Sequence, residues 1–145
     1  MAFFELRTPH DMLEKARREH NRLIAGFNID NVFNFFVTAY HIQDYICKTG
    51  VVPQPALDAF LGDQDILDAR DLCDKGKHLR LTKRPDPITA RQMLGPLNTA
   101  PLNVVPLNGY KEVWILQSGN RTLDVAALAD RVMQKWEQFF SANNL

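Results

Sequence analysis

The sequence predicts a mainly α-helical protein, an antiparallel helical bundle with one small β-hairpin inserted before the C-terminal helix. Apolar residues recur every three or four positions in several stretches, and helix-capping residues precede those stretches. An Asn-Gly pair between two apolar segments indicates the hairpin. The chain of 145 residues has the usual length of one domain, so we expect residues 1–145 to form a single domain.

The composition is that of a globular protein with no overall charge. Hydrophobic residues make up 46% of the chain and charged residues 23%, which excludes a disordered protein. The 17 Lys and Arg residues balance 17 Asp and Glu residues, so no overall field attracts nucleic acid or anionic lipid. RNA, if it is a partner, must therefore be held by a local cluster of cations.

Cysteine usage and hydropathy indicate a cytoplasmic protein. Cys47 and Cys73 form no CxxC motif and fall on the apolar sides of their predicted helices, so we expect two buried thiols in a reducing compartment. No His/Cys cluster has zinc spacing, and we expect neither a metal nor a cofactor. The apolar stretch 32–46 is too short and too polar to span a bilayer, and residues 1–5 have no basic leader. We therefore expect no secretory signal and no contact with a membrane.

The first helix is predicted to begin with Thr8 as its cap and Pro9 in its first turn. Gly26 and Asn28 suit its end. One face carries an apolar stripe: Leu13, Ala16, His20, Leu23 and Phe27. The opposite face carries a basic run: Lys15, Arg17, Arg18 and Arg22. The run is interpreted as a solvated face, and contact with an RNA backbone is the alternative.

The second helix is predicted to begin after Asn28 or Asp30 and to run to about Lys48, stopped by Gly50 and Pro53. It is apolar almost all the way round, which favours the centre of a bundle. A polar stripe interrupts it: Asn34, Thr38, His41 and Asp44. Polar groups on a central helix need partners, which the charged edge of a neighbouring helix could supply.

A short helix at residues 56–61 and a longer one at residues 64–81 are predicted next, followed by a turn-rich break at residues 83–87. The sequence Pro-Leu-Asn then recurs three times between residues 96 and 108. A period of five fits neither helix nor strand, so we interpret the repeat as an extended surface connector, with a docking strip as the alternative.

The hairpin is predicted to join residues 102–107 to residues 110–117 through Asn108-Gly109, with Pro106 restricting the first strand to an edge. A turn at residues 118–120 then leads to the last helix, which is predicted to start near Thr122 or Asp124. Its buried stripe is Val125, Leu128, Val132, Trp136 and Phe139.

The fourth helix carries the strongest candidate site. At 100° per residue, five ionisable side chains share an arc of roughly 120°. They are Arg70, Asp71, Asp74, Lys77 and His78. One interpretation is a solvated face with the pairs Arg70–Asp74 and Asp74–Lys77. Gly76 costs about 1 kcal/mol against alanine in mid-helix, and this suggests the close approach of a neighbouring helix or a second chain.

If the second and fourth helices face each other, five side chains converge: Arg70, Lys77, His78, His41 and Asp44. A histidine beside fixed cations could do general acid/base work on a phosphodiester, and an arginine could bind the phosphate through two donors. Asp71 or Asp44 could orient the imidazole. This chemistry requires no metal.

Two segments, FNFFVTAYHIQDY (residues 33–45) and ARDLCDKGKHLRL (residues 69–81), resemble the HEPN-like group of small bacterial helical proteins over about half of the chain. The resemblance implies a helical bundle that commonly dimerises, and many HEPN proteins are metal-independent ribonucleases of toxin–antitoxin and phage-defence systems. The roles implied here fall on Arg70, with Asp71 as its polar follower, and on His78. The ribonuclease pattern has about four to six residues between arginine and histidine. Here there are seven, which places the two side chains about 80° apart.

Two hypotheses follow. The first is a HEPN-like protein that acts on RNA as an endoribonuclease, with Arg70, His78 and Asp71 as catalytic residues and Lys77, His41 and Asp44 binding the substrate. The expected partners are RNA, a second copy of the chain and an antitoxin or other protein. The second is a non-catalytic helical dimer or partner-binding module in which the same charges form salt bridges. A small-molecule binder with a cleft between the second and fourth helices is a further alternative.

Overall fold

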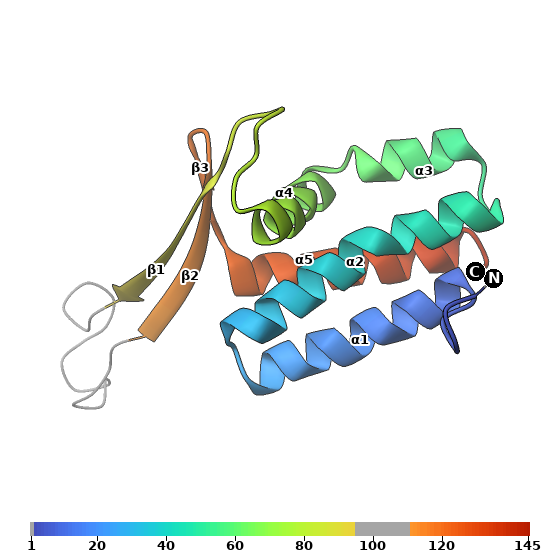
Figure 1. Ribbon diagram of the computed structural model, residues 1–145, viewed down its shortest axis with the longest axis horizontal. Coiled ribbons are helices and arrows are strands. Elements are labelled where there is room, and N and C mark those ends of the chain that lie inside the picture. Colours follow the sequence, from blue (N-terminus) through green and yellow to red (C-terminus); the bar gives the residue numbers. More distant parts are fainter. Residues whose placement is uncertain (1, 95–110) are drawn as a thin grey trace.

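The computed structural model describes residues 2–94 and 111–145, which form five helices and three strands (Figure 1). The order along the chain is α1 (Pro9–Ala25), α2 (Ile29–Thr49), α3 (Gln54–Leu61), α4 (Gln64–His78), β1 (Ile88–Leu94), β2 (Lys111–Ser118), β3 (Arg121–Asp124) and α5 (Val125–Ala142). The fold is therefore mainly helical, with a small antiparallel sheet before the C-terminal helix. This confirms the predicted fold class.

Local capping signals set the ends of α1 and α2. Thr8 Oγ1 accepts a hydrogen bond from the backbone N–H of Asp11, and Asp11 Oδ2 accepts one from the N–H of Thr8. The side chain of Asn28 accepts from the N–H of Asn31 and begins α2. Gly50 ends α2 with a φ of 65°, a left-handed conformation that glycine adopts without strain. Both predicted starts and the predicted stop of α2 are confirmed.

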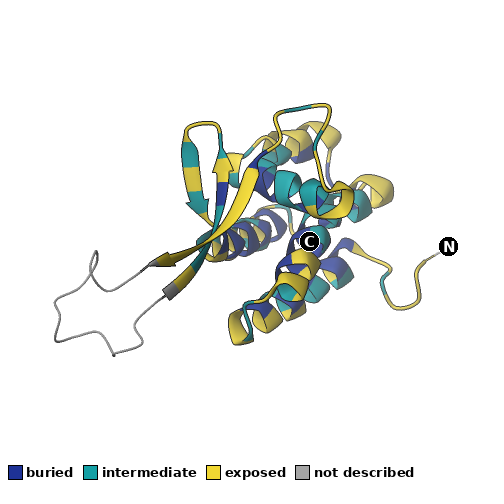
Figure 2. Ribbon diagram, turned by 60° about the vertical axis from the view of Figure 1, so that its left-hand side comes forward, coloured by how far each residue is buried: buried dark blue, intermediate teal, exposed yellow. Residues whose placement is uncertain are grey.

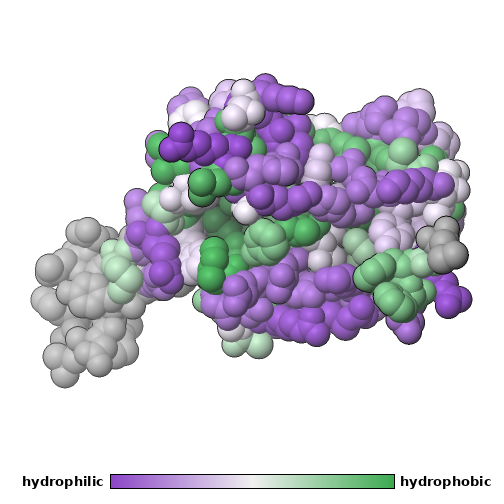
Figure 3. Space-filling model, viewed as in Figure 1, coloured by the Kyte–Doolittle hydropathy of each residue, from purple (hydrophilic) through white to green (hydrophobic). Residues whose placement is uncertain are grey.

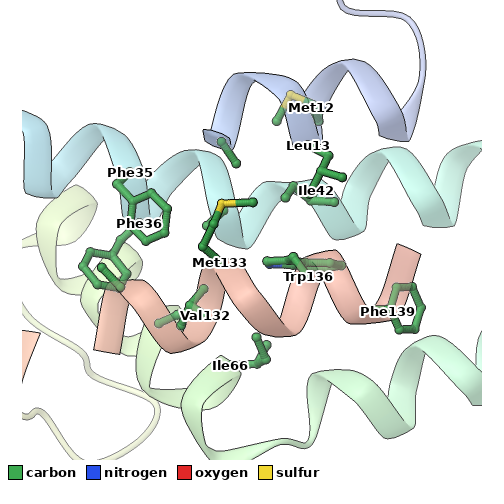
Figure 4. Packing of buried hydrophobic residues seen from close by; sticks show 14 of the residues in the cluster. Met12, Leu13, Phe35, Phe36, Ile42, Ile66, Val132, Met133, Trp136 and Phe139 are labelled. Atoms are coloured by element: carbon green, nitrogen blue, oxygen red, sulfur yellow. The ribbon is translucent and has the colours of Figure 1, made fainter. Parts of the chain in front are cut away.

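The core lies where α1, α2, α4 and α5 meet. Apolar side chains from all four helices interdigitate there (Figure 4). The largest fully buried ones are Trp136, Phe35, Phe36, Leu13, Ile42, Ile46, Leu57, Ile66, Leu116, Leu128 and Val132. The predicted apolar stripe of α5 is buried in full, and α2 buries residues on several sides. The bundle therefore has the single core that the helical periodicity predicts.

The sheet differs from the predicted hairpin. β1 pairs antiparallel with β2 from Ile88↔Gln117 to Leu94↔Lys111, and β2 pairs antiparallel with β3. β2 is the central strand, and β3 pairs with its residues 115–118. The predicted strand 102–107 lies outside the described residues, so its pairing with residues 110–117 stays a prediction. The Pro-Leu-Asn repeat and the Asn108-Gly109 turn lie outside the described residues.

The turn after β2 leads into a third strand instead of the last helix. Gly119 has a φ of 60° in this turn, as its place in a tight hairpin requires. Asp124 ends β3 and is at the same time the N-cap of α5, where its side chain accepts from the N–H of Ala126 and Ala127. The strand and the helix therefore join with no intervening residue.

The helix α4 ends at His78, three residues before the predicted end at Leu81. Leu79 has a φ of 67°, and its N–H still donates to Lys75 O. The following loop folds back, because Asp86 accepts from both Lys75 Nζ and the N–H of Leu81. The carboxylate of Asp86 thus competes with a further helical turn, and this long-range contact is invisible to periodicity.

Candidate binding groove

The charged face of α4 is organised by an arginine from the loop after the helix. Arg84 donates to Asp71 Oδ1 at 2.7 Å and to Asp74 Oδ2 at 2.6 Å. Arg70 donates to Asp71 Oδ1 at 3.2 Å through two of its nitrogens. Two carboxylates and two guanidinium groups therefore neutralise one another. In the described part of the chain, neither of the predicted pairs Arg70–Asp74 and Asp74–Lys77 forms.

A second contact joins α4 to α2. Lys77 Nζ lies 3.4 Å from His41 Nε2, and Cys73 Sγ lies 3.9 Å from His41 Nδ1. His41 Nδ1 also lies 2.7 Å from Val37 O, so this nitrogen carries the proton and Nε2 is the acceptor for Lys77. The predicted approach of His41 and Lys77 is confirmed by these distances.

The other polar residues of the α2 stripe do not share the contact that His41 makes with α4. Thr38 is buried, and its hydroxyl accepts from Lys15 Nζ of α1 at 2.9 Å. Asn34 is exposed and Asp44 is half-buried. The polar stripe of α2 is thus divided between two neighbouring helices, with Thr38 bound to α1 and His41 in contact with α4.

The basic run on α1 is mostly paired. Arg17 binds Glu14 and Glu137, whereas Lys15 and Arg22 both bind Glu19. These pairs leave little free positive charge for an RNA backbone on this face.

The two cysteines differ in burial. Cys73 is buried, and burial raises the pKa of its thiol to about 11, so it stays protonated at neutral pH and cannot serve as a nucleophile. Cys47 is exposed, which makes the prediction of two buried thiols wrong. Cys47 lies in the last turn of α2, next to the buried Ile46 but facing outward.

We expect iodoacetamide at mildly alkaline pH to alkylate Cys47 at least about tenfold faster than Cys73 in the native protein. The thiol of Cys73 is both shielded and protonated. Mass spectrometry of the two cysteine peptides over time measures the rates, and the same reaction in denaturant is the control, in which they converge. Equal rates in the native protein would contradict the burial of Cys73.

An apolar groove of about 940 Å³ opens beside the C-terminal end of α4. Its walls are the first turns of α2, the last turns of α4, β1, β2 and the start of α5. The apolar lining residues are Ile29, Val32, Phe33, Phe36, Leu72, Leu79, Ala90, Trp114, Ile115 and Val125. Figure 3 shows this hydrophobic surface as a hollow between α4, the sheet and the start of α2.

Gly76 shapes one wall of the groove. A Cβ atom at this position would lie 3.0 and 3.2 Å from two ring carbons of Phe33 on α2. The absence of a side chain lets the Phe33 ring lie directly against α4, and this ring remains 40% exposed along the groove. The close approach predicted from Gly76 is confirmed, and the neighbour is α2.

The opposite wall is formed by the sheet. Trp114 of β2 packs edge-on against Phe27, with ring centroids 5.2 Å apart. The guanidinium carbon of Arg91 lies 4.6 Å from the centre of the Trp114 ring, and Arg91 also pairs with Glu112. Residues 88–93 of β1 are all exposed, as Figure 2 shows for this strand.

The groove takes only part of the site predicted from the sequence. Lys77 and His78 line it, whereas Arg70, Asp71, His41 and Asp44 do not. His78 is exposed at the end of α4, and Arg70 is held by Asp71. The sequence reasoning missed Phe33, Trp114 and Arg91 as groove residues. Gly76 was a local signal for the approach of Phe33, and the sequence held no comparable signal for the other two.

The chain matches no protein-family model, no curated protein and no solved structure. The HEPN-like resemblance therefore stays a prediction. Within residues 2–94 and 111–145, no helix has the length and hydropathy that crossing a membrane requires. In the same residues, His, Cys, Asp and Glu side chains form no group of three that could hold a metal ion.

Proposed function

We propose that this protein is a non-catalytic binding module that takes an apolar ligand into the groove between α2, α4 and the sheet. The observation that carries the proposal is the groove itself, about 940 Å³ in volume and lined mainly by apolar side chains. Ligand sites in proteins are concave and mostly apolar, with volumes of about 300–1,000 Å³ and a few polar groups. This groove fits that description, and Phe33 and Leu79 are both exposed along it.

The contacts of the charged residues favour binding over catalysis. Arg84 and Arg70 neutralise Asp71, and Arg84 also binds Asp74, so neither carboxylate is free to act as a base or to orient His78. The thiol of Cys73 is protonated. A general acid/base site needs its groups within hydrogen-bond reach of one reacting atom, and Arg70 does not line the described groove that His78 lines.

Filling the groove with a large side chain is expected to weaken binding. Nile red, an uncharged apolar dye, should bind the native protein with increased fluorescence. The Ala90→Trp variant should bind it at least about tenfold more weakly, since Ala90 lines the groove from β1. Fluorescence titration measures both affinities, and circular dichroism checks the fold.

The matched control is Ala59→Trp, which places the same side chain on the exposed surface of α3 outside the groove. This variant should bind the dye as the parent protein does. If the parent protein fails to bind Nile red, or if both variants bind it equally well, the groove is not a ligand site.

The second candidate is the HEPN-like endoribonuclease, and the basic residues Lys77 and His78, with His41 beside Lys77, favour it. In this mechanism His78 is the general acid/base, and Arg70 must exchange Asp71 for a phosphate. The test is cleavage of total RNA in EDTA by the parent protein and by the variants His78→Ala and Arg70→Ala. The control variant is Arg18→Ala, which removes an exposed arginine from α1. Cleavage lost in the first two variants alone supports the nuclease. This candidate also requires the homodimer that the resemblance implies, which analytical ultracentrifugation measures.

A further inference from the structure

The ionisable residues that line the groove are all basic. They are Lys75, Lys77, His78 and Arg91, and no described Asp or Glu lines it. The chain as a whole has as many acidic as basic residues, so this one-sided lining differs from the average surface. When charged side chains of one sign line a cleft with apolar walls, the electric field inside the cleft is strengthened and attracts ligands of the opposite charge.

Two of these cations already have a carboxylate partner. Lys75 Nζ lies 3.0 Å from Asp86, and Arg91 Nε lies 2.9 Å from Glu112. Their charges are compensated within the protein, so they contribute little to the attraction of a ligand.

The other two basic residues have no such partner among the described residues. Among the described residues, neither Lys77 nor His78 forms an ion pair with a carboxylate. The contact of Lys77 with His41 Nε2 at 3.4 Å uses a neutral acceptor and leaves the ammonium charge uncompensated. Lys77 and His78 are adjacent and exposed, so both can reach one group at the α4 end of the groove.

We propose that the ligand of this groove is an amphiphile with one anionic head group, bound at the α4 end by Lys77 and His78. Its apolar body lies along Phe33, Phe36 and Trp114, which are among the apolar lining residues. The proposal rests on the binding function proposed above and adds the charge of the ligand. A carboxylate and a phosphate ester share this chemistry.

The experiment compares dodecyl probes that differ only in the head group, each below its micelle-forming concentration. Isothermal titration calorimetry measures the affinities of dodecanoate, dodecyl phosphate, dodecanol and dodecyltrimethylammonium for the full chain. Dodecanoate or dodecyl phosphate should bind at least about tenfold more tightly than dodecyltrimethylammonium, with dodecanol in between. The preference should shrink as salt is added, because Lys77 and His78 are exposed and salt screens exposed charges. The tighter of the two anions identifies the source of the head group.

The residue assignment is tested with Lys77→Gln and His78→Gln. Both variants should lose most of the preference for the anionic probe while still binding dodecanol. The matched control is Lys48→Gln, an exposed lysine at the end of α2 and outside the groove, which should keep the preference.

Each outcome separates the two proposals. Equal affinity for the anionic, neutral and cationic probes overturns the anionic head group but leaves the apolar binding function standing. A preference that survives both Lys77→Gln and His78→Gln overturns the assignment to these residues. If none of the dodecyl probes binds but Nile red does, the proposal that the ligand is an amphiphile is wrong. If Nile red fails as well, the binding function itself is wrong.

Discussion

Replacing Trp136 with alanine is expected to lower the free energy of unfolding by about 3–5 kcal/mol. Trp136 is fully buried, and its ring centre lies 4.5 Å from that of Phe60 and 5.8 Å from that of Phe139. Truncation removes buried apolar surface and leaves a cavity that aromatic neighbours can fill only in part. Urea unfolding followed by far-ultraviolet circular dichroism measures the loss.

Two further variants keep this prediction testable if Trp136→Ala does not fold, because whole domains are stable by only about 5–15 kcal/mol. Trp136→Phe retains an aromatic ring and should cost less than the alanine variant. Gln138→Ala, on the exposed side of the same helix, should change stability by less than about 0.5 kcal/mol. A loss below about 1 kcal/mol for Trp136→Ala would show that this ring does not occupy the core.

Replacing Arg121 with alanine is expected to cost about 3–5 kcal/mol as well, for an electrostatic reason. Arg121 Nη2 donates to both carboxylate oxygens of Asp68 at 2.7 Å. The Asp68 side chain is 2% exposed, and its other described partner is Gln64 Nε2 at 3.2 Å. Without Arg121 a carboxylate stays buried with no cation beside it, which costs far more than the pair itself contributes. Thermal and urea unfolding measure the loss.

The control for Arg121→Ala is a surface arginine with similar chemistry. Arg131 pairs with Asp65 at 3.2 Å while its side chain is 42% exposed, so Arg131→Ala should cost at most about 1 kcal/mol. The double variant Asp68→Ala/Arg121→Ala should be more stable than Arg121→Ala alone, because the unpaired charge is gone. Equal losses for Arg121→Ala and Arg131→Ala would mean that Asp68 is not buried as a charged group.

The sequence could predict the helices because their signals are local. The reciprocal bonds of Thr8 and Asp11 span four residues, and Gly50 ends α2 through its own backbone conformation. The heptad-like stripe ending in Phe139 predicts which side of α5 is buried. These features depend on residues within one or two helical turns of each other.

The sheet could not be predicted in the same way. The Asn108-Gly109 signal favours pairing of its immediate neighbours and does not indicate that β2 pairs with β1, which begins more than twenty residues earlier in the chain. The segment 88–94 has no strict apolar–polar alternation, since most of it faces solvent on both sides. Strand pairing over such a separation depends on tertiary contacts that periodicity does not encode.

The candidate site was predictable only in part for a similar reason. Helical spacing places Lys77 and His78 on one helix, and Gly76 indicates a close neighbour. Helical spacing does not show that Arg84, in the loop after α4, forms ion pairs with the carboxylates of α4. Nor does it show that Trp114 and Phe33 both line the groove. Those contacts join residues that the chain brings together only after the bundle and the sheet have formed.

The seamless junction at Asp124, where β3 passes directly into α5, has a mechanical consequence. A sheet joined through a flexible linker could rotate independently of the helix that follows it. Here no linker separates β3 from α5, so the two elements must move together. Arg121 of β3 also binds Asp68 of α4, so this pair of elements is tied to the helical bundle at a second point. Val125, in the first turn of α5, lines the groove, so widening the groove at this end would require the close-packed helix α5 to move together with β3.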